Sequence, residues 1–512
     1  MDTTSTLPGH VSTLVVGAGF GGLGMAIKLT ERGERDFLVL ERGDDVGGTW
    51  RDNTYPGAAC DVPSQLYSFS FAPNPTWSRS FSPQPEIQAY LRRVAVEAGV
   101  LDRFWFGTSF DAARWDQEEQ VWRVETSRGP VTADVLVTAS GGLSEPRMPD
   151  IDGIDSFQGE IFHSARWNHR YDLAGKRVAV IGTGASAIQI VPEIVEQTAH
   201  LDVYQRTAPW VMPRRDRAYT ALERFGFKHL PGLQRLYRTA IYWGRETFVP
   251  GFTVSPKLAA PAKKLALANI EKAISDPRLR QQVTPTFEIG CKRILISNDW
   301  YPALARDDVD LVTDPITKVT AGAVVTRDGV EREVDAIIVA TGFYTTEQPI
   351  AEHIIGRDGQ SLAEHWAGNG MTAYKGTTIN GFPNLFQIVG PNTGLGHSSM
   401  VFIIESQLAY ILDALRSMRD TDTATVEPRP DAQRAWNDDL QRRLRRTVWN
   451  TGGCSSWYLD AHGRNTTLWP RTTFTFRRLL SSFDQDKYLT TARTNPARPD
   501  ADRDADRVEQ SA

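Results

Sequence analysis

Two glycine-rich segments of this sequence have the residue types and spacing that bind the pyrophosphate of a dinucleotide. Each follows a short apolar run and precedes a segment with helical periodicity. The first small residue of this pattern allows a tight turn, the second lets a pyrophosphate approach the backbone, and the third lets the helix pack on the strand. The pyrophosphate then lies at a helix N-terminus, where free N–H groups and the helix dipole favour an anion. These residues are Gly17, Gly19 and Gly22 in the first segment and Gly182, Gly184 and Ala187 in the second.

The residue that ends the next strand of each unit distinguishes the two sites. Glu41 follows the apolar stretch 37–40, and Arg206 follows the β-rich stretch 201–205 at the same spacing from its turn. An acidic residue here accepts hydrogen bonds from ribose hydroxyls, whereas an Arg suits a 2′-phosphate, to which Thr207 adds a hydroxyl donor. We therefore predict FAD or NAD at the first site and NADP at the second. Further contacts to the second dinucleotide are predicted at Thr183, Ala185, Ser186 and Gln189.

The composition excludes several classes of protein. The chain has 512 residues and a formal net charge of −5, and it has no basic stripe, which argues against nucleic acid as a partner. No apolar run approaches the roughly 18 residues of a membrane span, and the N-terminus has no charged start followed by an apolar core, so we expect neither a span nor a signal peptide. Cys60, Cys291 and Cys454 are isolated and lack the spacing of metal ligands. We predict no metal site and a reducing, cytoplasmic location.

The elements that must position the two turns belong to an α/β protein with two Rossmann-like dinucleotide-binding domains, one for FAD and one for NADP. Residues 110–140 alternate apolar and polar side chains around a turn near 117–120, which indicates a β-rich insertion. The helical spacing of 216–285 predicts a helical insertion in the NADP domain. The predicted divisions are 1–150 for the first part of the FAD domain, 151–335 for the NADP domain, 336–488 for the return to the FAD domain with a C-terminal loop, and 489–512 for a disordered tail.

A third segment lies between the two glycine-rich units and reads FQGEIFHSARWN at residues 157–168. It resembles the fingerprint of the type I (class B) flavin-dependent Baeyer–Villiger monooxygenases, in which Phe, Gly, His and Trp occur in the order F-x-G-x-x-x-H-x-x-x-W. The chain departs from the family at Asn168, where the family usually has Pro or Asp. We interpret the segment as a linker that couples the two domains rather than as bond-making chemistry. The matching residues are Phe157, Gly159, His163 and Trp167.

Three further blocks are similar to the family and occur in its order, at residues 47–71, 290–304 and 452–460, so the resemblance spans about residues 11–485. It implies an FAD-containing, NADPH-dependent monooxygenase. In that reaction NADPH reduces FAD, O₂ forms a peroxide on the flavin, and the peroxide attacks a ketone to give an ester or lactone. The cofactor supplies the chemistry, and the protein supplies position, charge and exclusion of water.

The resemblance also assigns roles to single residues. It implies that Arg293 stabilises the anions of the reaction, since a guanidinium stays protonated and donates in a rigid fork. Asp61 matches the carboxylate that holds this Arg and the nicotinamide, and Lys292 helps to hold the nicotinamide cofactor. The positions beside the flavin and the Trp of the family's mobile loop are matched by Thr49, Trp50, Tyr67 and Trp457.

The residues alone leave two other functions open. An N- or S-oxidising flavin monooxygenase shares both dinucleotide sites, and overlap on sulfide substrates is expected. A non-catalytic FAD- and NADP-binding sensor would keep both glycine-rich turns. A flavin disulfide reductase is disfavoured because Cys60 has no nearby partner in the sequence. The sequence determines neither which ketone is oxidised nor the oligomeric state.

Overall fold

The first glycine-rich turn follows β1 (His10–Val16), an interior strand of the largest sheet in the computed structural model, which describes residues 6–493. β1 and β2 are mostly buried and pair in parallel, as expected for strands covered on both faces. Helix α1 (Phe20–Glu31) follows the turn and packs against α12 (Met400–Asp420). In order across the sheet the strands are β17 (Ile354–Ile355), β4 (Phe110–Asp116), β5 (Val121–Thr126), β6 (Val131–Thr138), β1, β2 (Phe37–Leu40) and β3 (Phe104–Trp105), and β18 (Leu385–Gln387) also pairs with β6.

The strands β4, β5 and β6 form the β-rich insertion expected from the alternating pattern. They pair antiparallel in sequence order, and a turn at residues 117–120 joins β4 to β5. The strands β17 and β18 come from the second half of the chain and pair in parallel with β4 and β6. The chain therefore crosses to a second sheet and later returns to the first.

The second glycine-rich turn follows β8 (Arg177–Ile181) in a five-stranded sheet whose strand pairs are all parallel. Helix α4 (Ala187–Ile194) begins after this turn and buries its apolar side chains in the core of this sheet. Strand β16 extends the second sheet beyond residue 335, where we expected this domain to end, because it pairs with both β7 and β8. The order across the sheet is β12 (Val309–Val312), β9 (His200–Tyr204), β8, β16 (Ala336–Val339) and β7 (Glu160–His163).

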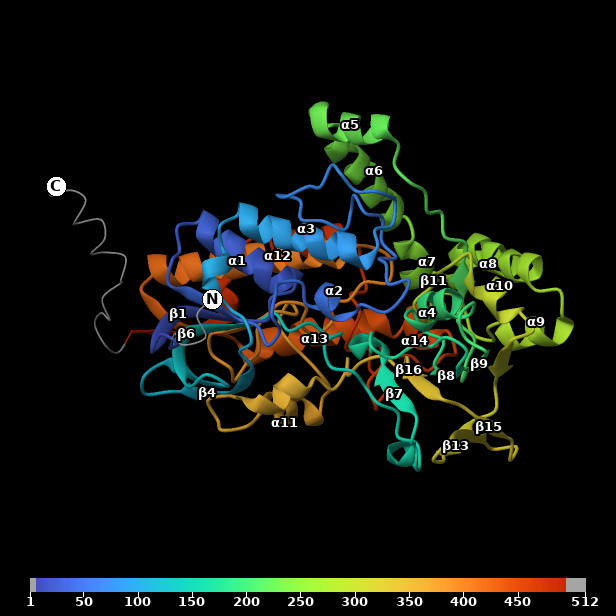
Figure 1. Ribbon diagram of the computed structural model, residues 1–512. Helices are drawn as coiled ribbons and strands as arrows, with labels where there is room; N and C mark the ends of the chain where they lie inside the picture. Colours follow the sequence, from blue (N-terminus) through green and yellow to red (C-terminus); the bar gives the residue numbers. More distant parts are fainter. Residues whose placement is uncertain (1–5, 494–512) are drawn as a thin grey trace.

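The helical insertion lies between two short strands, β10 (Val211–Met212) and β11 (Leu295–Ile296), which pair in parallel. Its helices α5 and α6 project from the body of the molecule, at the top of Figure 1. The last residue of α6, Glu246, is buried, so the C-terminal end of this helix returns to the interior. The insertion comprises α5 (Ala221–His229), α6 (Leu233–Glu246), α7 (Val249–Thr253), η4 (Pro256–Ala259), α8 (Ala260–Ala273) and α9 (Pro277–Val283).

The last described strand corrects the prediction of a disordered tail from residue 489. Strand β20 (Tyr488–Ala492) pairs antiparallel with β19 (Thr423–Pro428), and the buried ring of Tyr488 anchors its first residue. The rest of the predicted tail, residues 494–512, lies outside the described residues. A second small antiparallel sheet contains β13 (Ile316–Val319), β14 (Ala323–Thr326) and β15 (Glu331–Glu333).

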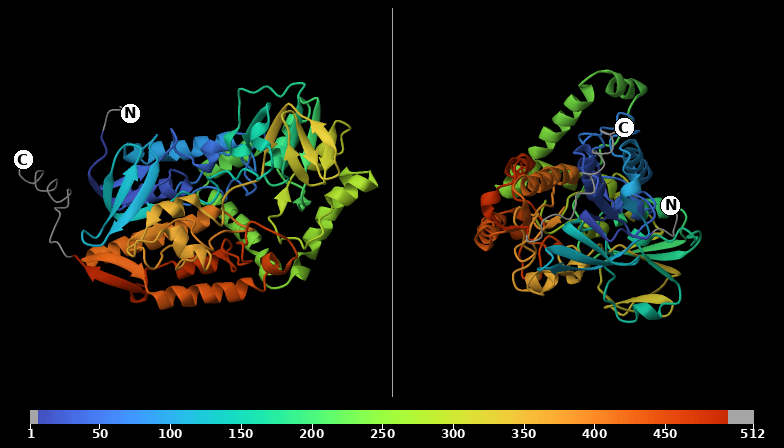
Figure 2. Two further views of the ribbon diagram at one scale, coloured as in Figure 1. Left: turned by 90° about the horizontal axis from the view of Figure 1, so that it is seen from below. Right: turned by 90° about the vertical axis from the view of Figure 1, so that its left-hand side faces the viewer.

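The two large sheets lie at opposite ends of an elongated molecule, with the late helices along one side of the first (Figure 2). Within residues 6–493, none of the helices combines the length and the apolar composition that a membrane crossing requires. The remaining helices are α2 (Thr49–Asp52), α3 (Gln84–Glu97), η1 (Leu101–Arg103), η2 (Ile154–Ser156), η3 (Ser164–Arg166), α10 (Trp300–Leu304), η5 (Pro349–His353), α11 (Leu362–Ala367), α13 (Pro430–Leu444), α14 (Val448–Thr451), α15 (Thr473–Leu479) and η6 (Gln485–Lys487).

Candidate functional site

The two glycine-rich turns share one backbone geometry. Gly17 and Gly182 have φ angles of 103° and 117°, in the region that favours glycine. Their N–H groups donate to the next strand of each sheet, at the carbonyl oxygens of Leu40 (2.8 Å) and Tyr204 (3.1 Å). Both turns therefore leave their strands in the manner that the spacing predicts.

The other small residues of the turns leave room beside the backbone. A Cβ on Gly22 would lie 1.8 Å from the carbonyl oxygen of Gly17, so α1 approaches the turn too closely for a side chain. At Gly19 the nearest atom to such a Cβ is 3.8 Å away, and at Gly184 no atom lies within 4 Å. These two glycines thus face open space, as a backbone that receives a pyrophosphate requires.

Glu41 lies at the end of β2, next to the first turn, and is buried. Its Oε2 accepts a hydrogen bond from the N–H of Ala18 (2.8 Å) and its Oε1 one from the N–H of Gly43 (2.7 Å). Arg51 forms an ion pair with the same carboxylate at 2.8 Å. Glu41 therefore holds the turn in place, and Arg51, which the sequence reasoning missed, balances its charge.

The residues predicted beside the flavin form an aromatic group close to the first turn. The indole Nε1 of Trp50 donates to the hydroxyl of Tyr67 at 3.0 Å, and the ring of Tyr67 lies 5.3 Å from that of Phe20, the first residue of α1. Burial raises the pKa of Tyr67, so its hydroxyl stays protonated. Thr49 begins α2 beside Trp50 and is exposed.

Arg206, Thr207 and Lys292 meet beyond the end of β9. The Nζ of Lys292 donates to the Oγ1 of Thr207 at 2.7 Å. Burial and the positive charge of Arg206 lower the pKa of Lys292. Neither cation has a carboxylate within 4 Å among the residues that the structure describes. An anion such as a 2′-phosphate would relieve the repulsion between these two cations.

The remaining residues predicted to contact NADP lie around the second turn. The hydroxyl of Thr183 donates to the carbonyl oxygen of Thr207 at 3.4 Å, Ala185 is exposed, and Ser186 precedes α4. Gln189 connects the two domains instead: its Oε1 accepts from the hydroxyl of Tyr55 at 3.0 Å. Its Nε2 also donates to the carbonyl oxygen of Ala59 at 3.0 Å. Contact between Gln189 and NADP stays a prediction.

Asp61 and Arg293 form a two-pronged ion pair. The Nε and Nη2 atoms of Arg293 donate to the two carboxylate oxygens of Asp61 at 2.7 and 2.6 Å. Burial alone would raise the pKa of Asp61, but the adjacent guanidinium outweighs it and lowers that pKa. The carboxylate in turn raises the pKa of Arg293. Both charges persist although the pair is largely enclosed, and side-chain exposures of 29% for Arg293 and 26% for Asp61 leave it open to a small molecule.

Three neighbours of this pair were missed by sequence reasoning. Arg245, from the C-terminal end of α6, donates through Nη2 to the backbone carbonyl of Asp61 at 3.2 Å. Nη1 of Arg293 donates to the carbonyl oxygen of Leu395 at 3.4 Å. Tyr458 is buried near Arg293, and burial raises the pKa of its hydroxyl to about 12. No local motif marks these residues, since each comes from a distant part of the chain.

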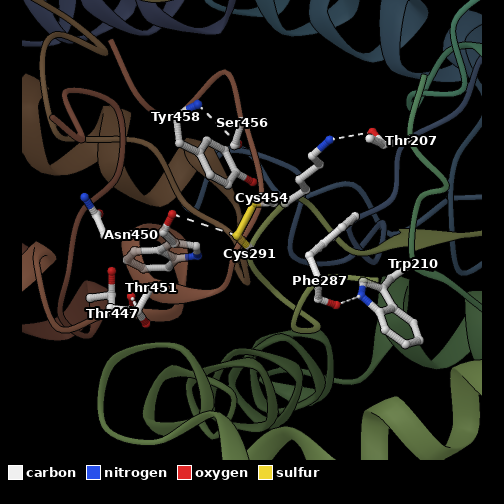
Figure 3. Close-up of a disulfide and its surroundings, with 12 residues drawn as sticks. Thr207, Trp210, Phe287, Cys291, Thr447, Asn450, Thr451, Cys454, Ser456 and Tyr458 are labelled. Carbon is white, nitrogen blue, oxygen red and sulfur yellow. Dashed lines mark hydrogen bonds between the residues drawn. A yellow bond between two sulfur atoms is a disulfide. The ribbon is translucent and has the colours of Figure 1, made fainter. Parts of the chain in front are cut away.

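A disulfide between Cys291 and Cys454 corrects the expectation that the cysteines are isolated. It joins the segment that carries Arg293 to the loop that carries Trp457, and Figure 3 shows Tyr458 and Thr207 on either side of it. Sequence reasoning missed the bond because its residues are 163 positions apart. The side chain of Trp457 is 44% exposed. Cys60 is the free cysteine, and burial raises the pKa of its thiol.

The fingerprint segment lies where the two domains connect. Phe157 and Gly159 precede β7, and a Cβ on Gly159 would lie 2.4 Å from the carbonyl oxygen of Asp335, which explains the need for glycine there. Trp167 packs against Phe162 with ring centroids 5.0 Å apart. The side chain of Asn168, the departure from the family, donates to Glu160 at 2.6 Å.

His163 is the buried centre of this connection. Its Nδ1 accepts from the N–H of Ala165 at 3.1 Å, and its ring lies 5.7 Å from that of Phe343. Phe343 forms a β-bridge with Pro146, so the two chain crossings between the domains touch at this point. These contacts agree with a linker role.

Comparison with known proteins identifies the family. Residues 14–223 match the family model described as pyridine nucleotide-disulphide oxidoreductase. A Baeyer–Villiger monooxygenase of Streptomyces coelicolor is 53% identical over 481 residues, which cover 94% of this chain and 92% of that protein. The chain belongs to the type I Baeyer–Villiger monooxygenases.

Solved structures of two monooxygenases agree with this family. The crystal structure of cyclohexanone monooxygenase from Rhodococcus sp. Phi1 bound to NADP+ is 29% identical, with a TM-score of 0.85 over 95% of this chain and all 100% of that one. The structure titled OTEMO complex with FAD and NADP is 28% identical, with a TM-score of 0.84 over 94% of this chain and 99% of that one. The predicted α/β fold with two dinucleotide-binding domains and the prediction of an FAD-containing, NADPH-dependent monooxygenase are confirmed.

Proposed function

We propose that this chain converts a ketone and O₂ into an ester or lactone, using FAD at the first glycine-rich turn and NADPH at the second. The observation that carries the proposal is the ion pair between Arg293 and Asp61, because it connects both sites. Asp61 follows the segment that holds Trp50, and the neighbour of Arg293, Lys292, contacts Thr207 at the second site.

The residues present fit both dinucleotides. Gly19 and Gly184 face open space at the two turns, Glu41 ends the strand beside the first, and Arg206 with Lys292 forms a cationic group beside the second. When bound, FAD supplies the redox chemistry and the activation of O₂. The protein must then position the ketone and manage charge.

Arg293 is the residue suited to that task. Negative charge develops on the carbonyl oxygen of a ketone when a nucleophile attacks its carbon, and a fixed donor aimed at this oxygen lowers the barrier selectively. The guanidinium of Arg293 stays protonated because Asp61 raises its pKa. Asp61 fixes the plane of the fork by accepting from two of its nitrogen atoms.

The test is to incubate the FAD-loaded protein with NADPH, isotopically labelled O₂ and a panel of linear, cyclic, aromatic and steroid ketones. We expect esters or lactones that contain one labelled oxygen atom. Arg293→Ala should keep FAD and lose on the order of a hundred- to a thousandfold in rate of ester formation. Arg278→Ala, at an exposed Arg of α9, serves as the matched control. Oxidation of amines and sulfides without any ester would favour the N- or S-oxidising function instead.

We also propose a cytoplasmic location, which the need for NADPH supports. The cysteines do not support it, because Cys291 and Cys454 are paired and disulfides are rare in reducing compartments. Cell fractionation with immediate trapping of thiols would test both points. Recovery in the periplasmic or secreted fraction would contradict this location.

A further inference from the structure

Arg245 brings a second guanidinium to the ion pair of Arg293 and Asp61. It is the penultimate residue of α6, in the helical insertion, and its Nη2 donates to the backbone carbonyl of Asp61 at 3.2 Å. The insertion is separate from the two glycine-rich turns, which follow β1 and β8. Arg245 therefore reaches Asp61 from the helical insertion and not from either glycine-rich turn. The binding of a pyrophosphate at those turns gives Arg245 no role.

The charge of Arg245 is not balanced by a direct contact. Both carboxylate oxygens of Asp61 are already bound by Arg293. Within residues 6–493 no carboxylate lies within 4 Å of the guanidinium of Arg245. The neighbouring thiol of Cys60 stays neutral because burial raises its pKa. The two guanidiniums and the one carboxylate leave a net positive charge at this point.

The acidic residue next to Arg245 in the sequence does not compensate it. Successive residues of a helix point about 100° apart, and Glu246 is bound elsewhere. Its Oε1 contacts Nε2 of His397 at 3.2 Å and accepts from the hydroxyl of Thr473 at 2.6 Å. Its Oε2 accepts from the N–H of Thr473 at 3.1 Å. Glu246 thus forms a separate, satisfied group.

The donors of Arg245 are available to a ligand. Apart from the bond to Asp61, its N–H groups have no partner among the described residues, and none of its nitrogen atoms is both sealed from solvent and unpaired. Burial lowers the pKa of Arg245 more than Asp61 raises it. A half-buried guanidinium with open donors is stabilised by an anion, and its planar fork matches a carboxylate.

We propose that Arg245 binds a carboxylate on the ketone substrate, so that the preferred substrates are oxo acids. This inference rests on the proposed function. The carboxylate would engage Arg245 while the ketone oxygen faces Arg293, and two fixed points would orient the carbonyl for attack. Arg245 is then a specificity-determining residue, and neutral ketones of the same shape are poorer substrates.

The test compares oxo acids with their methyl esters, which keep the carbon chain and remove the charge. A series with the ketone two to six carbons from the carboxyl group covers the unknown span. With the FAD-loaded wild-type protein we expect kcat/KM for the best acid to exceed that for its methyl ester by roughly ten- to a hundredfold, the effect of one charge-assisted contact. The rate is measured as ester or lactone product.

Arg245→Met should remove this preference: kcat/KM for the acid should fall at least tenfold further than kcat/KM for the methyl ester, so that the ratio of the two values approaches one. Arg245→Lys should restore part of the preference, because a point charge does not reproduce the fork. Arg235→Met, at an exposed Arg on the same helix, is the matched control and should change neither value. FAD content and circular dichroism of each variant show that it is folded.

Four results would overturn the inference. Equal loss on acid and methyl ester in Arg245→Met, or a raised KM for NADPH, would mean that Arg245 positions Asp61 or binds coenzyme. A wild-type protein that oxidises neutral ketones as well as their acids would also refute it, while leaving the proposed function intact. If no ketone of either kind gives an ester, the proposed function itself fails, and this inference fails with it.

Discussion

A disulfide joins Cys291, two residues before Arg293 in the chain, to Cys454, three residues before Trp457. Cys291 is fully buried, whereas Cys454 is partly exposed. The bond therefore ties the segment that carries Arg293 to the surface loop that carries the exposed Trp457. Without the disulfide, no covalent bond would hold this loop against the segment of Arg293.

The disulfide predicts a defined count of thiols. The chain contains 3 cysteines, so the unfolded, unreduced protein should show one reactive thiol, from Cys60, and all should react after reduction. Cys454→Ser should lower the free energy of unfolding by roughly 2–4 kcal/mol, because the bond closes a long loop. Reductant should destabilise the wild type similarly and leave the variant unchanged. Full thiol reactivity before reduction would contradict the bond.

The open space at Gly19 and Gly184 predicts two variants that fold and lose different cofactors. Gly19→Val should purify colourless because its side chain occupies the place of the FAD pyrophosphate. Gly184→Val should stay yellow and show a strongly raised KM for NADPH. Each variant controls for the other, and neither Cβ meets an atom closer than 3.8 Å in the protein. A yellow Gly19→Val protein with full FAD would refute the first assignment.

The parts of the site that the sequence predicts are those encoded over short distances. The turns at Gly17 and Gly182 and the strand ends at Glu41 and Arg206 follow from local strand–turn–helix spacing, and the structure places them accordingly. The position of Arg245 could not be predicted. It belongs to the helical insertion, where the spacing of apolar residues indicates a helix but not what that helix contacts. Its role depends on where the last turn of α6 meets the rest of the molecule.

Other contacts depend on docking between domains. Gln189 follows the second glycine-rich turn, a position that suggests contact with the cofactor. Its amide nevertheless binds Tyr55 and Ala59 of the first domain. The pairing of Cys291 with Cys454 likewise requires the C-terminal loop to return to the second domain's insertion. Sequence spacing predicts neither of these two contacts, because the partners are far apart in the chain.

His163 predicts a loss of stability in mild acid. Burial lowers its pKa from 6.5 to about 4, so the unfolded chain binds more protons than the folded protein between these values. Its contribution is fully present above pH 6.5 and is lost as the pH falls toward 4, by roughly 2–3 kcal/mol. Urea unfolding at pH 7.5, 6 and 5 should show this loss in the wild type. His163→Gln should be less stable at pH 7.5 but lose less on acidification, and His229→Gln, at an exposed His, should behave as the wild type.

The cationic group beside the second turn predicts the choice of coenzyme. Arg206→Ala should raise the KM for NADPH by roughly ten- to a hundredfold, the effect of losing a charge-assisted contact to phosphate, and leave the KM for NADH little changed. Lys292→Met should act in the same direction, because the Nζ of Lys292 binds Thr207, and burial together with the charge of Arg206 lowers its pKa. The double variant should lose less than the sum of the two effects, since removing either cation relieves the repulsion on the other. Initial rates of NADPH and NADH oxidation with a saturating ketone measure all of these values. Equal losses with both coenzymes would show that the variants disturb the fold or the nicotinamide instead of the 2′-phosphate.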